Sequence, residues 1–226
     1  MRILVVAATG MEIAPVVTRL RHTSDGGPKI KTYTFGDHDV DVLTTGVGMV
    51  ATAAWCSHQL ALTPYDLALN FGVCGSFDRA LRPGNVVHVV SDRIAELGAE
   101  DQDTFLTIQQ LNLLGDDECP FTGGQLLNRT PPANSTLSGL PAVTGITVNT
   151  VHGRESSITA VVQRFMPQVE SMEGAAFMYS CLILGVAFAQ VRSVSNVVEP
   201  RNRETWKISE AIRNLGQTAL SILDNA

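Results

Sequence analysis

The chain has 226 residues, of which 45% are hydrophobic and 6% aromatic, a composition that supports a large core of aliphatic side chains. Its formal net charge of −6 argues against nucleic acid or a membrane surface as a partner, because both require a basic face. No apolar run is long enough to cross a bilayer, and the start leads directly into a strand without an export signal, so we expect a cytoplasmic protein. The four cysteines lack the paired spacing of a metal or disulfide site, and we expect neither a metal nor a cofactor.

The first third of the chain alternates strands with helices. Residues 2–7 form a continuous apolar run, which is typical of a strand covered on both faces, and apolar periodicity predicts a helix over residues 12–20. Residues 29–35 and 40–45 are rich in β-forming side chains around a short polar turn, which predicts a hairpin. Glu12 lies just after the first strand, a common ligand position in open α/β sheets, although a first-turn carboxylate is also favoured by the helix dipole alone.

Glycine-bearing turns dominate the middle of the chain. Gly46 and Gly48 precede a predicted helix over residues 49–60 and allow a ligand to approach the backbone, but the full dinucleotide-binding fingerprint is absent. Residues 67–71 form the next buried strand, which ends in a glycine-rich turn over residues 72–76, and residues 85–91 form another strand. The acidic segment 94–105 indicates a solvated loop, and residues 115–138 indicate a long surface excursion.

The last third contains the most informative stretch, residues 169–177. It places Glu170 and Glu173 at the head of an apolar run that continues to residue 184 and predicts a largely buried helix. A buried carboxylate needs hydrogen-bond donors, which either free N–H groups at a helix start or two neighbouring ligand hydroxyls would supply. Further elements are predicted as strands over residues 145–151 and 186–194 and as helices over residues 155–165 and 203–223.

This alternation, together with one hairpin, predicts the α/β class: a three-layer α/β/α sandwich with a central mixed, mostly parallel sheet. No linker-like composition divides the chain, so we expect residues 1–226 to form one domain.

Several motifs together resemble the nucleoside phosphorylase/nucleosidase superfamily, which includes the 5′-methylthioadenosine/S-adenosylhomocysteine nucleosidases. The resemblance covers most of the chain and is greatest to the futalosine hydrolase family. It rests on Phe-Gly-Val-Cys-Gly-Ser (71–76), Ala-Glu-Leu-Gly-Ala-Glu-Asp (95–101), Val-Asn-Thr-Val (148–151), Glu-Ser-Met-Glu-Gly-Ala-Ala-Phe (170–177) and Ser-Asn-Val-Val-Glu-Pro-Arg-Asn-Arg (195–203). It implies cleavage of a ribose–purine bond through a transition state similar to an oxocarbenium ion, with a nucleoside and water as partners. It also implies assembly into a homodimer or larger homo-oligomer.

The resemblance implies three catalytic residues. Glu173 matches the glutamate that holds the ribose hydroxyls, with Met172 beside the sugar, and Glu12 matches the general base that takes a proton from water. Asn196 stands where adenosine-cleaving relatives carry Asp. An amide donates to a carbonyl oxygen or accepts from an N–H, which suits hypoxanthine, the 6-oxopurine of futalosine; a loop-stabilising role is the alternative. Ser171 replaces a glutamate of the methylthioadenosine enzymes and argues against their substrate.

The remaining predicted contacts surround these three residues. The turn at residues 149–153 aligns with the base site, and the basic pair after Asn196 is expected to meet the carboxylate at the benzoate end of futalosine, unless it is simply solvated. The predicted substrate-binding residues are Met172, Val73, Cys74, Gly75, Thr150, Val151, His152, Ser195, Arg201 and Arg203.

The sequence therefore predicts a hydrolase that releases hypoxanthine from futalosine in menaquinone biosynthesis. A phosphorylase would need several Arg or Lys residues around phosphate, but residues 8–12 carry none and Glu12 would repel the anion. A methylthioadenosine-type nucleosidase is disfavoured by Asn196 and Ser171. A non-catalytic nucleoside-binding protein is disfavoured because Glu12 and Glu173 are both present.

Overall fold

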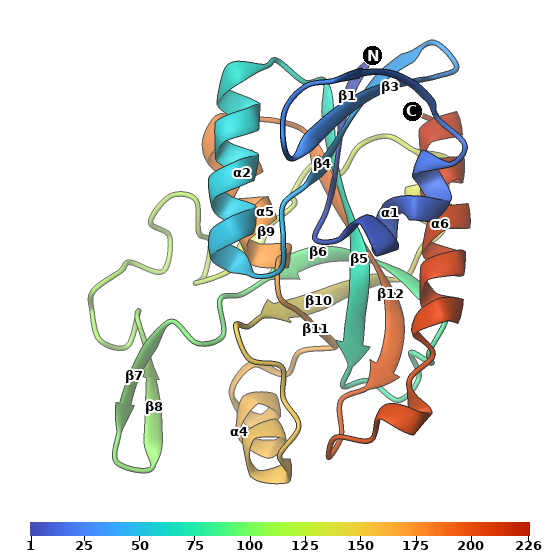
Figure 1. Cartoon of the computed structure of the whole chain (residues 1–226). Helices are drawn as coiled ribbons and strands as arrows, with labels where there is room; N and C mark the ends of the chain where they lie inside the picture. The colour runs from blue at the N-terminus through green and yellow to red at the C-terminus, as the bar shows by residue number, and fades with distance from the viewer.

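The computed structural model describes all residues, 1–226, and arranges them around a ten-stranded sheet with helices on both faces (Figure 1). The strand order is β11-β10-β6-β12-β5-β1-β4-β3-β2, with β9 beside β6. The centre of the sheet, β4-β1-β5-β12, is parallel, and antiparallel pairs lie toward both sides. Strand β11 also pairs with β5, so β5, β12, β6, β10 and β11 close into a ring.

The central strands of the sheet follow apolar runs of the sequence, whereas β2 and β7 are polar and exposed. The strands of the sheet are β1 Arg2–Ala7, β2 Arg21–Asp25, β3 Ile30–Phe35, β4 His38–Thr44, β5 Leu67–Ser76, β6 Val86–Asp92, β9 Leu126–Leu127, β10 Ala142–Thr147, β11 Val169–Ser171 and β12 Phe188–Val197. A separate hairpin is formed by β7 Gly98–Asp101 and β8 Thr104–Thr107. The helices are α1 Gly10–Val17, α2 Met49–Leu62, α3 Ser135–Gly139, α4 Glu155–Phe165, α5 Gly174–Leu184 and α6 Ile208–Asp224, with a 3-10 turn η1 at Arg203–Thr205.

Two apolar cores hold the three layers together. Helices α1 and α6 cover one face of the sheet, where α6 contributes a single apolar stripe that includes Leu215, Ala219 and Ile222. Helices α2 and α5 cover the other face. Helix α5 packs against α2 and against β10 and β12, and it is apolar on most sides, as Phe177 and Met178 illustrate, because most of its residues are buried.

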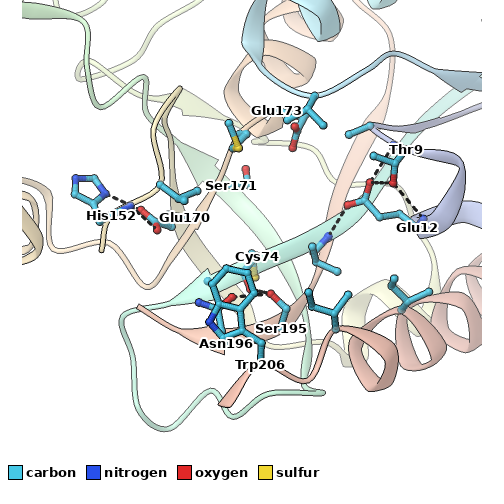
Figure 2. Close-up of a pocket in the computed structure, with 18 of the residues that line it drawn as sticks. Thr9, Glu12, Cys74, His152, Glu170, Ser171, Glu173, Ser195, Asn196 and Trp206 are labelled. Carbon is cyan, nitrogen blue, oxygen red and sulfur yellow. Dashed lines mark hydrogen bonds and ion pairs between the residues drawn. The ribbon is translucent and has the colours of Figure 1, made fainter. Parts of the chain in front are cut away.

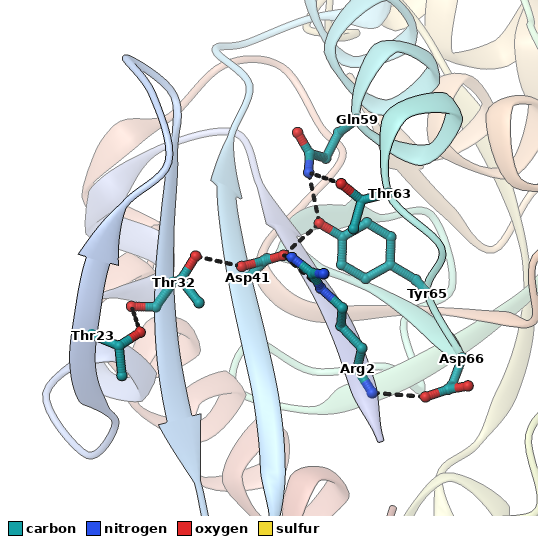
Figure 3. Close-up of polar contacts among 8 residues, drawn as sticks. All are labelled: Arg2, Thr23, Thr32, Asp41, Gln59, Thr63, Tyr65 and Asp66. Carbon is teal, nitrogen blue, oxygen red and sulfur yellow. Dashed lines mark hydrogen bonds and ion pairs between the residues drawn. The ribbon is translucent and has the colours of Figure 1, made fainter.

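A buried carboxylate, Asp41, anchors the strands at the far end of the sheet from the cavity described below (Figure 3). It accepts hydrogen bonds from Arg2 Nη2 at 3.0 Å, from the Tyr65 hydroxyl at 2.7 Å and from Thr32 Oγ1 at 2.7 Å. Burial is the main cause that raises the pKa of Tyr65, so its hydroxyl stays protonated and remains a donor. These bonds join β1, β3 and β4 to Tyr65, which lies in the loop between α2 and β5. None of these residues belongs to the predicted site.

The alternation of elements, the three layers and the hairpin of β3 and β4 are confirmed. Two expectations at the sheet are wrong. Residues 94–105 are not a simple loop, since they include β7 and the start of β8, which stand away from the main body (Figure 1). The helix expected from residue 172 begins at Gly174, because Val169–Ser171 pairs as β11 with β10 and β5 and places Glu170 in a strand.

Several element ends also differ from expectation. Strands β5 and β12 continue to Ser76 and Val197, so the glycines after residue 71 lie in a strand instead of a turn. The last helix begins at Ile208, after the short turn η1, and the exposed edge strand β2 was not predicted. The longer central strands carry more residues toward one end of the sheet, and the candidate site lies there.

Candidate active site

A cavity of about 370 Å³ opens at the carboxyl ends of β1, β5, β11 and β12 (Figure 2). Its walls come from residues 8–12, 73–75, 170–173 and 195–197, and α6 closes one side. Parallel strands direct the loops that follow them to one edge of the sheet, which is where open α/β folds bind ligands. The cavity brings together five segments that are far apart in the sequence.

Glu12 is held at this cavity by a capping box at the start of α1. Thr9 Oγ1 accepts from the Glu12 N–H, and one Glu12 carboxylate oxygen accepts from Thr9 N at 3.0 Å and from Thr9 Oγ1 at 2.8 Å. The other oxygen accepts from Val73 N on β5 at 3.1 Å. Glu12 is 7% exposed, so three donors fix the carboxylate at the inner wall while it remains open to a ligand.

Glu173 faces the same cavity from the position just before α5. Its carboxylate accepts from Gly48 N at 3.0 Å, in a turn where Gly48 has φ of 98°, a value that other residues rarely adopt. Burial is the largest cause that raises the pKa of Glu173, while nearby Arg192 and the Gly48 N–H lower it. The two glutamates thus enter the cavity from different elements, each with a backbone N–H behind it.

The positive charge of Arg192 lies behind the wall and not in the cavity. Its guanidinium donates to the Asn70 side chain and to the Val191 carbonyl. A side chain at Gly72 would meet Arg192 Nη1 at 3.1 Å and Glu12 Oε1 at 3.2 Å, so a glycine is needed to let these groups approach. The positive charge of Arg192 therefore balances part of the negative charge of Glu12 and Glu173 from inside the protein.

Asn196 forms the opposite wall at the end of β12. Its Nδ2 donates to the Val197 carbonyl at 3.0 Å, and its Oδ1 lies 2.8 Å from Ser195 Oγ. Ser195 Oγ is also 3.1 Å from the Cys74 carbonyl oxygen. Burial raises the pKa of the Cys74 thiol to about 12, so this cavity residue is a neutral thiol and not a nucleophile.

Glu170 is a cavity residue whose role sequence reasoning missed. It is 4% exposed, and its carboxylate accepts from His152 N at 3.1 Å and bonds His152 Nδ1 at 2.7 Å (Figure 2). The strand β11 explains this position, because its pairing with β5 sets Glu170 opposite Gly75, which also lines the cavity.

An aromatic side chain and two arginines lie beside the entrance at residues 201–206. Trp206 lines the cavity, and the Arg201 and Arg203 guanidinium carbons lie 5.0 and 5.8 Å from its ring centre. Arg201 lines the cavity, whereas Arg203 does not. The tryptophan was not singled out from sequence, since nothing local to residue 206 indicates that η1 turns it toward β12.

Of the predicted site residues, all except Thr150 and Arg203 line the cavity. Thr150 is exposed, and its N–H is directed to Glu96 Oε1 at 3.3 Å. Sequence reasoning missed Thr9 and Trp206, and it singled out Glu170 only as a carboxylate at a helix start, without including it among the predicted site residues. Only Thr9 carries a local signal, the Thr-x-x-Glu spacing of a capping box.

No group of three or more His, Cys, Asp or Glu side chains is arranged to hold a metal ion. None of the helices combines the length and the apolar character needed to cross a membrane.

The three-layer fold and the carboxylate-lined cavity can be compared with those of known protein families. A family model described as the phosphorylase superfamily matches residues 2–226, and the chain belongs to this family. It is 29% identical over 187 residues to the futalosine hydrolase of Thermus thermophilus, covering 80% of each chain. It is 31% identical over 186 residues to the futalosine hydrolase of Streptomyces coelicolor, covering 77% of this chain and 74% of the relative. The chain is accordingly an enzyme, a hydrolase that acts on N-glycosyl bonds.

Solved structures agree on the fold. A 5′-methylthioadenosine/S-adenosylhomocysteine nucleosidase from Colwellia psychrerythraea in complex with adenine superposes with a TM-score of 0.78 at 21% identity, covering 100% of this chain and 95% of that one. A futalosine hydrolase mutant of Helicobacter pylori superposes with a TM-score of 0.76 at 15% identity, covering 100% of both chains.

Proposed function

We propose that this enzyme cleaves the N-ribosidic bond of futalosine and releases hypoxanthine and dehypoxanthine futalosine, a step in menaquinone biosynthesis. The names of the Thermus and Streptomyces relatives support this substrate. The observation that carries the proposal is the Glu12 carboxylate, fixed at the cavity wall by Thr9 and by the Val73 N–H.

The carboxylate of Glu12 acts as a general base in the proposed reaction. It takes a proton from water, and the water oxygen bonds to the anomeric carbon as the electron pair of the N-glycosidic bond leaves with the purine. The departing purine takes up a proton from solvent and is released as neutral hypoxanthine. Glu173 accepts hydrogen bonds from the ribose hydroxyls, with Met172 beside the sugar. The negative charge of the two carboxylates stabilises the positive charge that develops on the ribose in the transition state.

Hydrolysis is favoured over phosphorolysis by the distribution of charge. Among the residues that line the cavity, Arg201 is the one Arg or Lys. Arg192 is 1% exposed and is directed to Asn70 behind the wall. A phosphate ion next to Glu12 would face a carboxylate without a cluster of cations to offset its charge.

The purine is placed at the Asn196 side of the cavity. The Asn196 amide suits a 6-oxopurine, which favours hypoxanthine over adenine as the leaving base. Ser171, where the methylthioadenosine enzymes carry a glutamate, argues against their substrate. Trp206 provides an aromatic surface near Asn196. Arg201 beside it binds the benzoate carboxylate of futalosine, a charge-assisted contact.

Chromatography of reactions with futalosine, inosine and methylthioadenosine, with and without phosphate, tests the proposal. Free hypoxanthine from futalosine in phosphate-free buffer, with little adenine from methylthioadenosine, is the expected result. Turnover that requires phosphate would make the enzyme a phosphorylase and remove the role of Glu12. Release of adenine would contradict the role of Asn196, and no turnover of any nucleoside would favour a binding protein.

Cytoplasmic location and assembly into a homodimer or larger homo-oligomer accompany the proposal. Sedimentation of the purified chain measures the assembly, and a monomer that turns over futalosine at the full rate would contradict it.

A further inference from the structure

Glu173 occupies the position just before α5, where a side chain commonly caps the first turn of its own helix. The carboxylate of Glu173 does not cap α5. It accepts a hydrogen bond from Gly48 N on another segment and lines the cavity. The first N–H groups of a helix have no partner within the helix, so α5 must receive acceptors from other residues.

Two hydroxyl groups from neighbouring strands supply these acceptors. Ser171 Oγ, on β11, accepts from Gly174 N at 3.2 Å. Thr147 Oγ1, at the end of β10, accepts from Ala175 N at 2.7 Å. Thr147 is fully buried and does not line the cavity, so its hydroxyl contacts the helix and not a ligand. The carboxylate of Glu173 is thereby left free for the cavity.

Asp92, at the end of β6, fixes the direction of the Thr147 hydroxyl. An N–H group can only donate, so the hydroxyl proton is not used by Ala175 and is donated to Asp92 Oδ1 at 3.0 Å. Asp92 Oδ1 also accepts from Arg93 N at 2.8 Å, and Asp92 Oδ2 accepts from Gln190 Nε2 at 3.0 Å. Asp92 is 1% exposed, so these contacts hold its carboxylate in one orientation.

The start of α5 lies directly against this network. A Cβ at Gly174 would overlap Asp92 Oδ2, so a glycine is needed for the helix to approach so closely. The hydrogen bonds from Thr147 to Asp92 and from Ala175 to Thr147 join β6 and β10 to the first turn of α5. Because Glu173 immediately precedes this turn, its backbone position depends on the same contacts.

We propose that Thr147, oriented by Asp92, is a positioning residue that holds the first turn of α5 and so keeps the Glu173 carboxylate in place to bind the ribose. This inference rests on the proposed function, which assigns the ribose hydroxyls to Glu173. A helix end frays when its N–H groups lose their acceptors. In the frayed state Glu173 leaves the cavity wall, and the affinity for a nucleoside falls with the fraction of molecules in which Glu173 is in place. Bound substrate restores the turn, so kcat changes little.

The substitution Thr147→Val removes the acceptor and keeps the shape of the side chain. We measure KM and kcat for futalosine and Kd for hypoxanthine, which carries no ribose. The expected result is a rise in KM of about tenfold, with kcat within about threefold and Kd for hypoxanthine unchanged. Thr147→Ser keeps the hydroxyl and should restore KM. Ser180→Ala is the control and should leave KM unchanged, because it removes a buried hydroxyl of the same helix that contacts Ser57 and the Ala176 carbonyl and no N–H of the first turn.

An unchanged KM in Thr147→Val, or the same rise in KM in Thr147→Ser, would overturn the inference. If Thr147→Val does not bind hypoxanthine, Thr147→Cys takes its place, since a thiol of similar size is a weak acceptor. Hydrogen exchange needs no substrate: the Ala175 amide should exchange at least about tenfold faster in Thr147→Val than in Thr147→Ser, and equal rates would also overturn the inference. Absence of hypoxanthine release from futalosine by the starting protein would instead refute the proposed function, so the two failures are distinguishable.

Discussion

Replacing Glu12 with glutamine should separate catalysis from substrate binding. The carboxylate receives three donors, Thr9 N, Thr9 Oγ1 and Val73 N, at 2.8 to 3.1 Å. A glutamine side chain has one oxygen, so its NH2 group must face either the Thr9 or the Val73 N–H, which loses its acceptor at a cost of about 1–3 kcal/mol of stability. The amide also cannot take a proton from water, and loss of a general base lowers kcat by roughly 10²–10⁴, equivalent to about 3–5 kcal/mol.

The assay is hypoxanthine release from futalosine, with kcat and KM determined separately and unfolding by urea measured beside them. We expect Glu12→Gln to lower kcat with little change in KM, because the lost interaction acts in the transition state. Thr9→Val is the matched control, since it removes the cap hydroxyl at a cost of about 1 kcal/mol but leaves the carboxylate. A fall in kcat of less than tenfold for Glu12→Gln, or an equal fall in both variants, would refute the assignment of Glu12 as base.

Three further predictions address packing, pH and the substrate tail. In Gly174→Ala, the new Cβ would overlap the Gln190 and Asp92 side chains, so urea unfolding should show a loss of about 1–3 kcal/mol, whereas Gly139→Ala, with nothing within 4 Å, should be neutral or stabilising. Burial raises the pKa of Asp92 from 3.8 to about 6, so the unfolded state releases this proton first and the unfolding free energy should fall by about 3 kcal/mol between about pH 4 and pH 6. That fall should be absent in Asp92→Asn, and an unchanged pH profile would contradict the burial argument. Arg201→Ala should raise KM for futalosine by about tenfold and leave KM for inosine unchanged, while equal effects on both would exclude a contact with the benzoate end.

The layers of the fold were predictable because continuous apolar runs and one-sided helical periodicity report burial directly. The β11 strand was not predictable, since Val169–Ser171 is three residues long and joins an apolar helix through Met172 and Glu173, so that no change of period marks the boundary. The hairpin of β7 and β8 also gave no signal. Strand β7 is exposed and ends in two acidic residues, and an exposed strand need not show the alternation that a core imposes, while β8 is only four residues long.

In the candidate site, too, some features could be predicted from the sequence and others could not. Glu12 and Glu173 attract attention as carboxylates beside apolar runs, and a resemblance to a family adds roles for them. The partners of these carboxylates lie 61 and 125 positions away, at Val73 and Gly48, so no local pattern could supply them. Glu170 was mistaken for a residue of the helix start for the same reason, because its place in the cavity depends on pairing with Gly75 across β5.

Three of the four carboxylates that line the cavity are fixed in the same way, since each accepts a hydrogen bond from a backbone N–H of another segment. Val73 N serves Glu12, Gly48 N serves Glu173 and His152 N serves Glu170. Backbone donors carry no net charge, so they orient the carboxylates and leave their negative charge available to a ligand. A cluster of cations beside these carboxylates would have neutralised their charge and attracted phosphate, whereas Arg192 balances part of that charge from behind the wall without competing for the ligand. The arrangement favours water as the nucleophile through the same contacts that hold the glutamates in place.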